Sequence, residues 1–194
     1  GAGKTSLLGA LLAECPPHER LVLVEDVREL HVRHPHVVAL LGRSANGEGR
    51  GGVTLVDLVR QALRMRPDRL VVGEVRGAEV RELLSALNTG HRGGFGTVHA
   101  NAPEQVPSRF VGLGALAGMS PDAVDRQLAG ALDAVVHVGR DTGGVRRVES
   151  VAVVEDGRVE PALVLRASSR GGTPRYAAAA GAERLAHRVG RGPG

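Results

Sequence analysis

Five residues at the start of the chain form the first group whose types and spacing could do chemistry. They run Gly1-Ala2-Gly3-Lys4-Thr5 and match the second half of the phosphate-binding pattern G-x-x-x-x-G-K-[ST]. In such a loop the backbone N–H groups face a phosphate at the start of a helix, whose dipole favours anions. The lysine reaches the β- and γ-phosphates, and the Thr5 hydroxyl binds Mg²⁺. These residues predict a nucleotide site, with an ordinary turn at a helix start as the alternative.

A second group is an apolar run, 70–72, that ends in Gly73-Glu74. In open α/β sheets, ligands bind at the carboxyl ends of the strands. Glu74 would then lie beside the phosphate loop, where it could polarise an attacking water molecule. The alternative is a surface carboxylate paired with Arg76.

The position before Glu74 is unusual, because many phosphate-loop enzymes carry a Mg²⁺-binding aspartate there and this chain has Gly73. Another acidic residue should therefore help to hold the metal. Glu25 and Asp26 follow the apolar run 21–24, and Glu29 lies one turn further on. We expect Glu25 to hold Mg²⁺ through water; a solvated pair or a helix start is the alternative.

Histidines form the third group, in Thr89-Gly90-His91 and in the segment 97–101, which contains His99. His99 follows a short apolar strand, where a sensor of the γ-phosphate is needed; a structural loop histidine is the alternative. A zinc site is disfavoured by the spacing of the two histidines and the lack of cysteine partners. Arg64 and Arg66 could stabilise phosphate charge within or between subunits, or could simply end a solvated helix.

Hydrophobic periodicity and turn residues predict the elements that must position these groups. Helices are expected at 4–13, 54–65, 80–87, 104–117 and 121–132, with Pro107 delaying or kinking the fourth. Strands are expected at 21–24, 36–41, 70–72, 97–98, 134–138, 147–154 and 159–165, the last two joined by a turn at Asp156-Gly157. This alternation predicts an α/β domain over residues 1–167 with a mostly parallel central sheet. Residues 168–194 are expected to be a low-complexity or disordered tail, or a weak helix near 177–189.

Composition narrows the class of protein. Lys4 is the only lysine among 25 basic residues, and the net charge is only +4. Aromatic residues make up 2% of the 194 residues, so almost nothing is available for base stacking, and we expect no nucleic-acid partner. The apolar runs are too short for membrane insertion. A single cysteine and no targeting segment indicate a cytoplasmic protein. Because the chain starts inside a motif, we expect a fragment whose upstream part is missing.

Together these motifs resemble the secretion and pilus motor ATPases, the family of type II and type IV secretion and Tad/Flp pilus assembly motors. Glu25-Asp26 through Glu29 match its aspartate box, Gly73 to Arg76 its Walker B motif, and the two histidine segments its histidine box. The stretch 63–77 looks most like the Tad/Flp branch and its type IV secretion relatives. The resemblance covers about residues 1–138.

The resemblance implies a RecA-like P-loop NTPase domain that lacks its first strand and N-terminal domain. It further implies ATP and Mg²⁺ as ligands, a homo-oligomer of hexameric form, and a cytoplasmic location peripheral to the inner membrane, under a platform protein of a pilus or secretion system. Glu74 and Glu25 become the catalytic residues, and Thr5 and Glu25 hold the metal. The residues expected to bind the nucleotide are Gly1, Ala2, Gly3, Lys4, Thr5, Ser6, Arg76 and His99.

The expected function is ATP hydrolysis that drives pilus assembly or secretion across the cell envelope. Two other hypotheses remain at this point. One is a catalytically silent scaffold subunit that binds nucleotide only for assembly; the other is a RecA-like nucleic-acid motor, which would need a basic or aromatic channel. The presence of Glu74, Glu25 and His99 together favours the hydrolytic enzyme over the scaffold.

Overall fold

A computed structural model describes residues 2–48, 50–90, 93–141, 143–166 and 174–190. Its first sheet has four strands in the order β2-β1-β3-β4, and all three pairings are parallel. The strands are β1 (Leu21–Glu25), β2 (Val37–Leu41), β3 (Arg69–Val72) and β4 (Phe95–Gly96). The predicted α/β class with a parallel central sheet is therefore confirmed.

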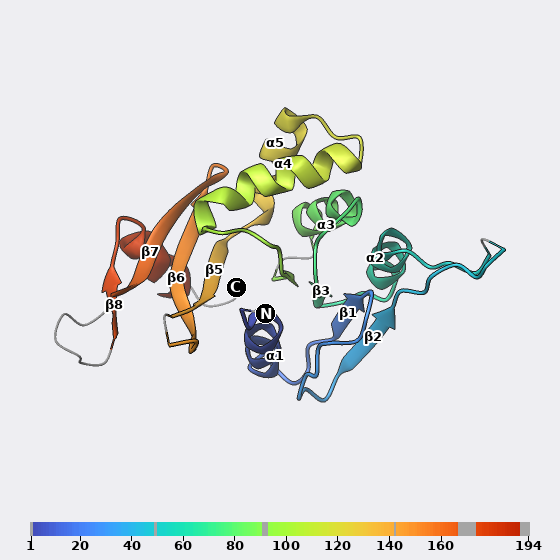
Figure 1. Ribbon diagram of the computed structural model, residues 1–194, viewed down its shortest axis with the longest axis horizontal. Helices are drawn as coiled ribbons and strands as arrows, with labels where there is room; N and C mark the ends of the chain where they lie inside the picture. Colours follow the sequence, from blue (N-terminus) through green and yellow to red (C-terminus); the bar gives the residue numbers. More distant parts are fainter. Residues whose placement is uncertain (1, 49, 91–92, 142, 167–173, 191–194) are drawn as a thin grey trace.

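Helices cover both faces of this sheet, because its central strands are apolar on both faces. Leu21 and Leu23 of β1 pack in the core that contains α1, while the alternate Val22 and Val24 pack in the core of the other helices. Figure 1 shows these layers. The helices are α1 (Lys4–Ala13), α2 (Leu55–Arg64), α3 (Glu79–Asn88), α4 (Val106–Leu116) and α5 (Pro121–Ala131).

The strands of the C-terminal half form a separate antiparallel sheet in the order β5-β6-β7-β8. They are β5 (Ala134–Arg140), β6 (Arg146–Glu155), β7 (Arg158–Arg166) and β8 (Arg175–Ala178), and α6 (Ala182–Gly190) contacts β6 and β7. In Figure 1, α1 lies between the two sheets. Within the segment 168–194, for which we expected disorder or a weak helix, the described residues thus form β8 and α6.

Two boundaries differ from the expectations for physical reasons. The strand expected at 97–98 lies two residues earlier, as β4, and the backbone of Thr97 then continues the pairing through Thr97 N to Val72 O at 3.3 Å. Helix α4 begins at Val106, after a 3₁₀ turn over Pro103–Gln105, so Pro107 does not delay its start. Pro107 lies in its first turn, where the missing N–H costs no intrahelical hydrogen bond.

Parallel pairing determines where the functional side chains can meet. Because β1, β3 and β4 run in the same direction, their carboxyl ends share one edge of the sheet. Glu25 is the last residue of β1, Glu74 follows β3 by two residues, and His99 follows β4 by three. The N-terminal end of α1 faces the same edge, since Lys4 at its start contacts His99.

Candidate active site

The phosphate loop leads directly into α1. Gly3 adopts the left-handed conformation, with φ 100°, immediately before the first helical residue, Lys4. Such a backbone strongly favours glycine. The first turn of α1 contains no acidic residue, so its free N–H groups and positive dipole end are available to an anion. The predicted helix start is confirmed, and its geometry suits a phosphate group.

Glu25 is the most unusual acidic residue of the site, because only 4% of it is exposed. Its Oε1 accepts hydrogen bonds from the backbone N–H groups of Glu29, at 3.1 Å, and Leu30, at 2.9 Å. Its Oε2 is buried and has no hydrogen-bond partner among the described residues. A buried carboxylate oxygen without a partner carries a large desolvation penalty, which a ligand or water in the adjoining cavity would relieve. The solvated-pair alternative therefore does not apply to Glu25.

The glycine before Glu74 has a steric explanation. A Cβ atom on Gly73 would lie 2.8 Å from Cγ of Glu25, closer than real Cβ contacts allow. The carboxylate of Glu25, which comes from β1, thus occupies the space that a side chain at position 73 would need. The acidic side chain beside position 73 therefore comes from the neighbouring strand, β1.

Lys4, His99 and Glu74 form a continuous hydrogen-bonded chain. Lys4 Nζ lies 3.3 Å from His99 Nδ1, and His99 Nε2 lies 2.8 Å from Glu74 Oε1. An ammonium group only donates, so Nδ1 accepts and the ring proton sits on Nε2, which donates to Glu74. The side chain of Glu74 is 40% exposed, so water can reach its carboxylate. Glu74 is therefore paired with His99 and not with Arg76.

Arg76 pairs instead with Asp26, which follows β1. The hydrogen bond and charge of Asp26 raise the pKa of the Arg76 guanidinium above its usual range. This pair links the loop after β3 to the loop after β1, and its Arg76 side chain is 59% exposed. Arg76 lies at the cavity, as predicted, with its charge partly balanced by Asp26.

These groups line one cavity of about 380 Å³. Its lining combines the phosphate loop with the ends of β1, β3 and β4, and adds Arg146 from the start of β6. The residues are Ala2, Gly3, Lys4, Thr5, Ser6, Glu25, Asp26, Val27, Glu29, Gly73, Glu74, Arg76, Thr97, His99 and Arg146. The structure thus brings together Glu74, Glu25, Arg76, His99 and the described residues of the phosphate loop in one cavity.

Sequence reasoning missed Arg146. It lies in the antiparallel sheet, yet its Cδ is 3.0 Å from where a Cβ of Gly3 would be, so its side chain packs against the phosphate loop. Among the described residues, the side chain of Arg146 has neither an ion pair nor a hydrogen bond, whereas that of its neighbour Arg147 pairs with Asp141 at 2.8 Å. In a chain with 24 arginines, no sequence signal distinguishes Arg146.

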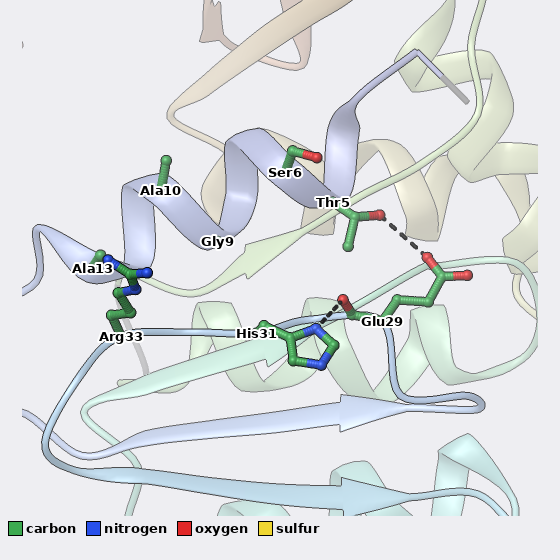
Figure 2. A pocket seen from close by; sticks show the side chains of 8 residues that line it. All are labelled: Thr5, Ser6, Gly9, Ala10, Ala13, Glu29, His31 and Arg33. Carbon is green, nitrogen blue, oxygen red and sulfur yellow. Dashed lines mark hydrogen bonds between the residues drawn. The ribbon is translucent and has the colours of Figure 1, made fainter.

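A second hollow borders the first along α1. The hydroxyl of Thr5 and the carboxylate of Glu29 point toward one another and form a 3.3 Å hydrogen bond between α1 and the segment after β1, as Figure 2 shows. Thr5, Ser6 and Glu29 line both hollows and form the wall between them. Beyond these three residues, the second hollow is lined by Gly9, Ala10 and Ala13 of α1 and by His31 and Arg33.

Some predicted residues lie elsewhere. Gly1 and His91 fall outside the described residues. Arg64 and Arg66 end α2 and precede β3, so they lie toward the amino ends of the strands and do not line the cavity. The structure therefore does not support their role within one subunit, and a role between subunits stays a prediction.

The chain belongs to the family described as type II/IV secretion system protein, whose family model matches residues 1–154. A Mycobacterium tuberculosis protein named as a candidate conjugal transfer protein is 58% identical over 169 residues, which are 86% of this chain and 48% of that protein. Protein VirB11 of Agrobacterium fabrum is 36% identical over 162 residues, covering 81% of this chain and 46% of the relative. The chain spans about half the length of these curated relatives.

Solved structures agree with this assignment. The VirB11 ATPase of the Brucella suis type IV secretion system, crystallised with sulphate, superposes with a TM-score of 0.69 and 31% identity, covering 79% of this chain and 45% of that one. The pilus retraction motor PilT with bound ADP has the same fold, at a TM-score of 0.56 and 22% identity, over 98% of this chain and 48% of that one. None of the described helices is long and apolar enough to cross a membrane.

Proposed function

We propose that this cavity binds ATP with Mg²⁺ and hydrolyses it. One observation carries the proposal: Lys4, Glu25, Glu74 and His99, which come from four different segments, meet in one cavity at the carboxyl edge of the parallel sheet. The family membership and the likeness to the Brucella suis VirB11 ATPase support it. The test is phosphate release by the full-length protein, which should require Mg²⁺.

Positive groups on two elements suit the phosphates. The N-terminal end of α1 offers backbone N–H groups, and Lys4 supplies a charge that can leave His99 for the β- and γ-phosphates. Arg146, from β6, adds a second cation beside Gly3. Ala2 and Ser6 line the same end of the cavity. In this arrangement a polyphosphate is bound by groups that the protein has already assembled.

Thr5 and Glu25 are the residues that would hold Mg²⁺. Hydroxyl, carboxylate and water oxygens are the ligands this ion prefers, and it usually keeps several of its waters. The unpartnered Oε2 of Glu25 fits a role as acceptor from such a water. Among the described residues, no three His, Cys, Asp or Glu side chains are grouped to hold a metal directly, which agrees with binding through water. When bound, the ion would neutralise charge on the β- and γ-phosphates.

Glu74 is the group best placed to activate water. Its carboxylate is partly exposed and is oriented by the 2.8 Å hydrogen bond from His99. It would accept a proton from a water molecule while that water attacks the γ-phosphate. When a γ-phosphate binds, it would draw Lys4 away from His99 Nδ1. His99 would then respond to the presence of the γ-phosphate and also orient Glu74, the proposed base.

The finer function follows from the resemblance of the motifs and from the family. We propose a ring-shaped motor, a homohexamer, that works in the cytoplasm at the inner membrane and pushes on a platform protein of a pilus or secretion system. Relatives named for type IV secretion and for conjugal transfer support the secretion class. The Tad/Flp pilus branch is the subsystem that the stretch 63–77 favours.

A first prediction concerns the metal. Substitution Glu25→Gln keeps the Oε1 acceptor for Glu29 and Leu30 but replaces the free oxygen with an NH₂ group. We expect the Mg²⁺ concentration for half-maximal hydrolysis to rise by about 10–100-fold, as for other residues that act through a metal's waters. The measurement is a Mg²⁺ titration of phosphate release by the full-length protein. The control is Glu82→Gln, since Glu82 pairs on the surface with Arg60. An unchanged Mg²⁺ midpoint in Glu25→Gln would remove Glu25 from the metal site.

A further inference from the structure

Thr97 holds the backbone on both sides of Glu74. Its hydroxyl donates a 2.6 Å hydrogen bond to the carbonyl oxygen of Gly73, the residue before Glu74. Its own carbonyl accepts a 2.8 Å hydrogen bond from the N–H of Val75, the residue after Glu74. Thr97 N also donates to Val72 O at 3.3 Å. One residue of the segment after β4 thus contacts three residues around the proposed base.

The same segment carries the side-chain partner of Glu74. His99 lies two residues beyond Thr97, and its Nε2 is 2.8 Å from Glu74 Oε1. The hydrogen bonds of Thr97 thus hold the residues on either side of Glu74, while His99 holds the Glu74 side chain, and both come from one short segment. A glutamate whose neighbouring backbone and whose carboxylate are both held has few other positions to adopt.

Gly73 makes this restraint necessary. A side chain there would collide with Glu25, whose Cγ would be 2.8 Å from its Cβ, so the position must be glycine. Glycine, however, has the largest backbone freedom of any residue. The proposed base therefore follows directly on the most flexible type of residue in the chain. The hydroxyl of Thr97 restrains that residue from outside, through the carbonyl that Gly73 presents.

We propose that Thr97 is a positioning residue for hydrolysis, which holds the Gly73–Glu74 backbone so that the Glu74 carboxylate faces the site of water attack. This inference rests on the proposed role of Glu74 as general base. Thr97 itself acts through Glu74 and makes no step of its own. Its side chain is only half-buried, so loss of the hydroxyl should affect the reaction more than the fold.

The test compares Thr97→Val, which removes only the hydroxyl from a similar shape, with Thr97→Ser, which keeps it. A displacement of about 1 Å in a catalytic group can cost about 10²-fold, so we expect Thr97→Val to lower kcat by about 10–100-fold in the full-length protein. ATP affinity should change by less than about threefold, because the group acts only in the reaction. Thr97→Ser should hydrolyse ATP close to the parent rate.

Ser108→Ala is the matched control, since the Ser108 hydroxyl also donates to a backbone carbonyl, at 2.9 Å, from an exposed position of α4. It should keep the parent rate. Thermal melting of each variant identifies any loss of folding. Thr97→Val at the parent rate, or Thr97→Ser as slow as Thr97→Val, would overturn the inference.

A double-mutant cycle separates this inference from the proposed function. If Thr97 acts through Glu74, Thr97→Val should cause no further loss in a Glu74→Gln background. An equal further loss in that background would mean that Thr97 acts elsewhere, and would overturn the inference while Glu74 keeps its role. If Glu74→Gln alone hydrolyses ATP at the parent rate, the proposed base is wrong and the inference fails with it.

Discussion

Glu74→Gln should reduce ATP hydrolysis by about 10²–10⁴-fold, the usual contribution of general-base catalysis. Glutamine keeps the size of the side chain and an oxygen that can accept from His99 Nε2, but it cannot take a proton from water. The geometry of the 2.8 Å contact should therefore survive while the chemistry stops. The measurement is steady-state phosphate release by the full-length protein.

ATP affinity should hold or improve in the same variant. The γ-phosphate is negatively charged, so removal of the Glu74 charge removes a repulsive neighbour. A binding titration beside the rate measurement separates these effects. Glu82→Gln provides the control, because the same substitution then breaks a surface ion pair with Arg60, 2.7 Å long, away from the cavity. Hydrolysis by Glu74→Gln at the parent rate would show that Glu74 is not the base.

Lys4→Ala should weaken ATP binding by tenfold or more. A hydrogen bond to a charged group contributes about 1.5–3 kcal/mol, and about 1.4 kcal/mol corresponds to a factor of ten. The substitution also removes the donor to His99 Nδ1, so the orientation of His99 toward Glu74 should loosen as well. Direct titration with ATP on the full-length protein measures the first effect.

Arg60→Ala is the control for Lys4→Ala, since it removes a cation of similar length from a surface ion pair. It should bind ATP as the parent does. An ATP affinity of Lys4→Ala equal to that of the parent would exclude the phosphate-loop interpretation of residues 1–5. Loss of affinity in both variants would indicate a general charge effect instead of a specific contact.

The sequence alone was enough to predict the position of those site residues that directly follow a strand or begin a helix. Glu25, Glu74 and His99 each come at or just after an apolar run, and parallel strands bring their ends to one edge. Lys4 opens a run with leucines at helical spacing, which indicates the start of a helix. For these residues, local pattern and general sheet topology were enough.

Contacts between distant segments could not be predicted in the same way. The collision that requires glycine at position 73 involves Glu25, from the neighbouring strand, and is visible only when both side chains are placed. The bond from Thr97 to the carbonyl of Gly73 needs the register of β4 beside β3, and the expected strand was two residues out. Register errors of this size change which side chains meet.

The second sheet was the least predictable part of the fold. Its strands were predicted individually, including the hairpin at Asp156-Gly157, but not their separation from the parallel sheet. That separation is what carries Arg146 to the phosphate loop, more than 140 residues along the chain from Gly3. A long-range approach of this kind depends on how the second sheet packs against α4 and the 3₁₀ turn before it, which leaves no local signal.

Phosphate release by the unmodified full-length protein, with and without Mg²⁺, tests the central claim most directly. We expect hydrolysis that requires Mg²⁺, stops when the metal is chelated, and rises steeply with protein concentration as rings assemble. Protein that binds ATP yet releases no phosphate with Mg²⁺, even as assembled rings with the platform protein present, would contradict the claim. In that case the chain would be a nucleotide-binding scaffold and not a motor.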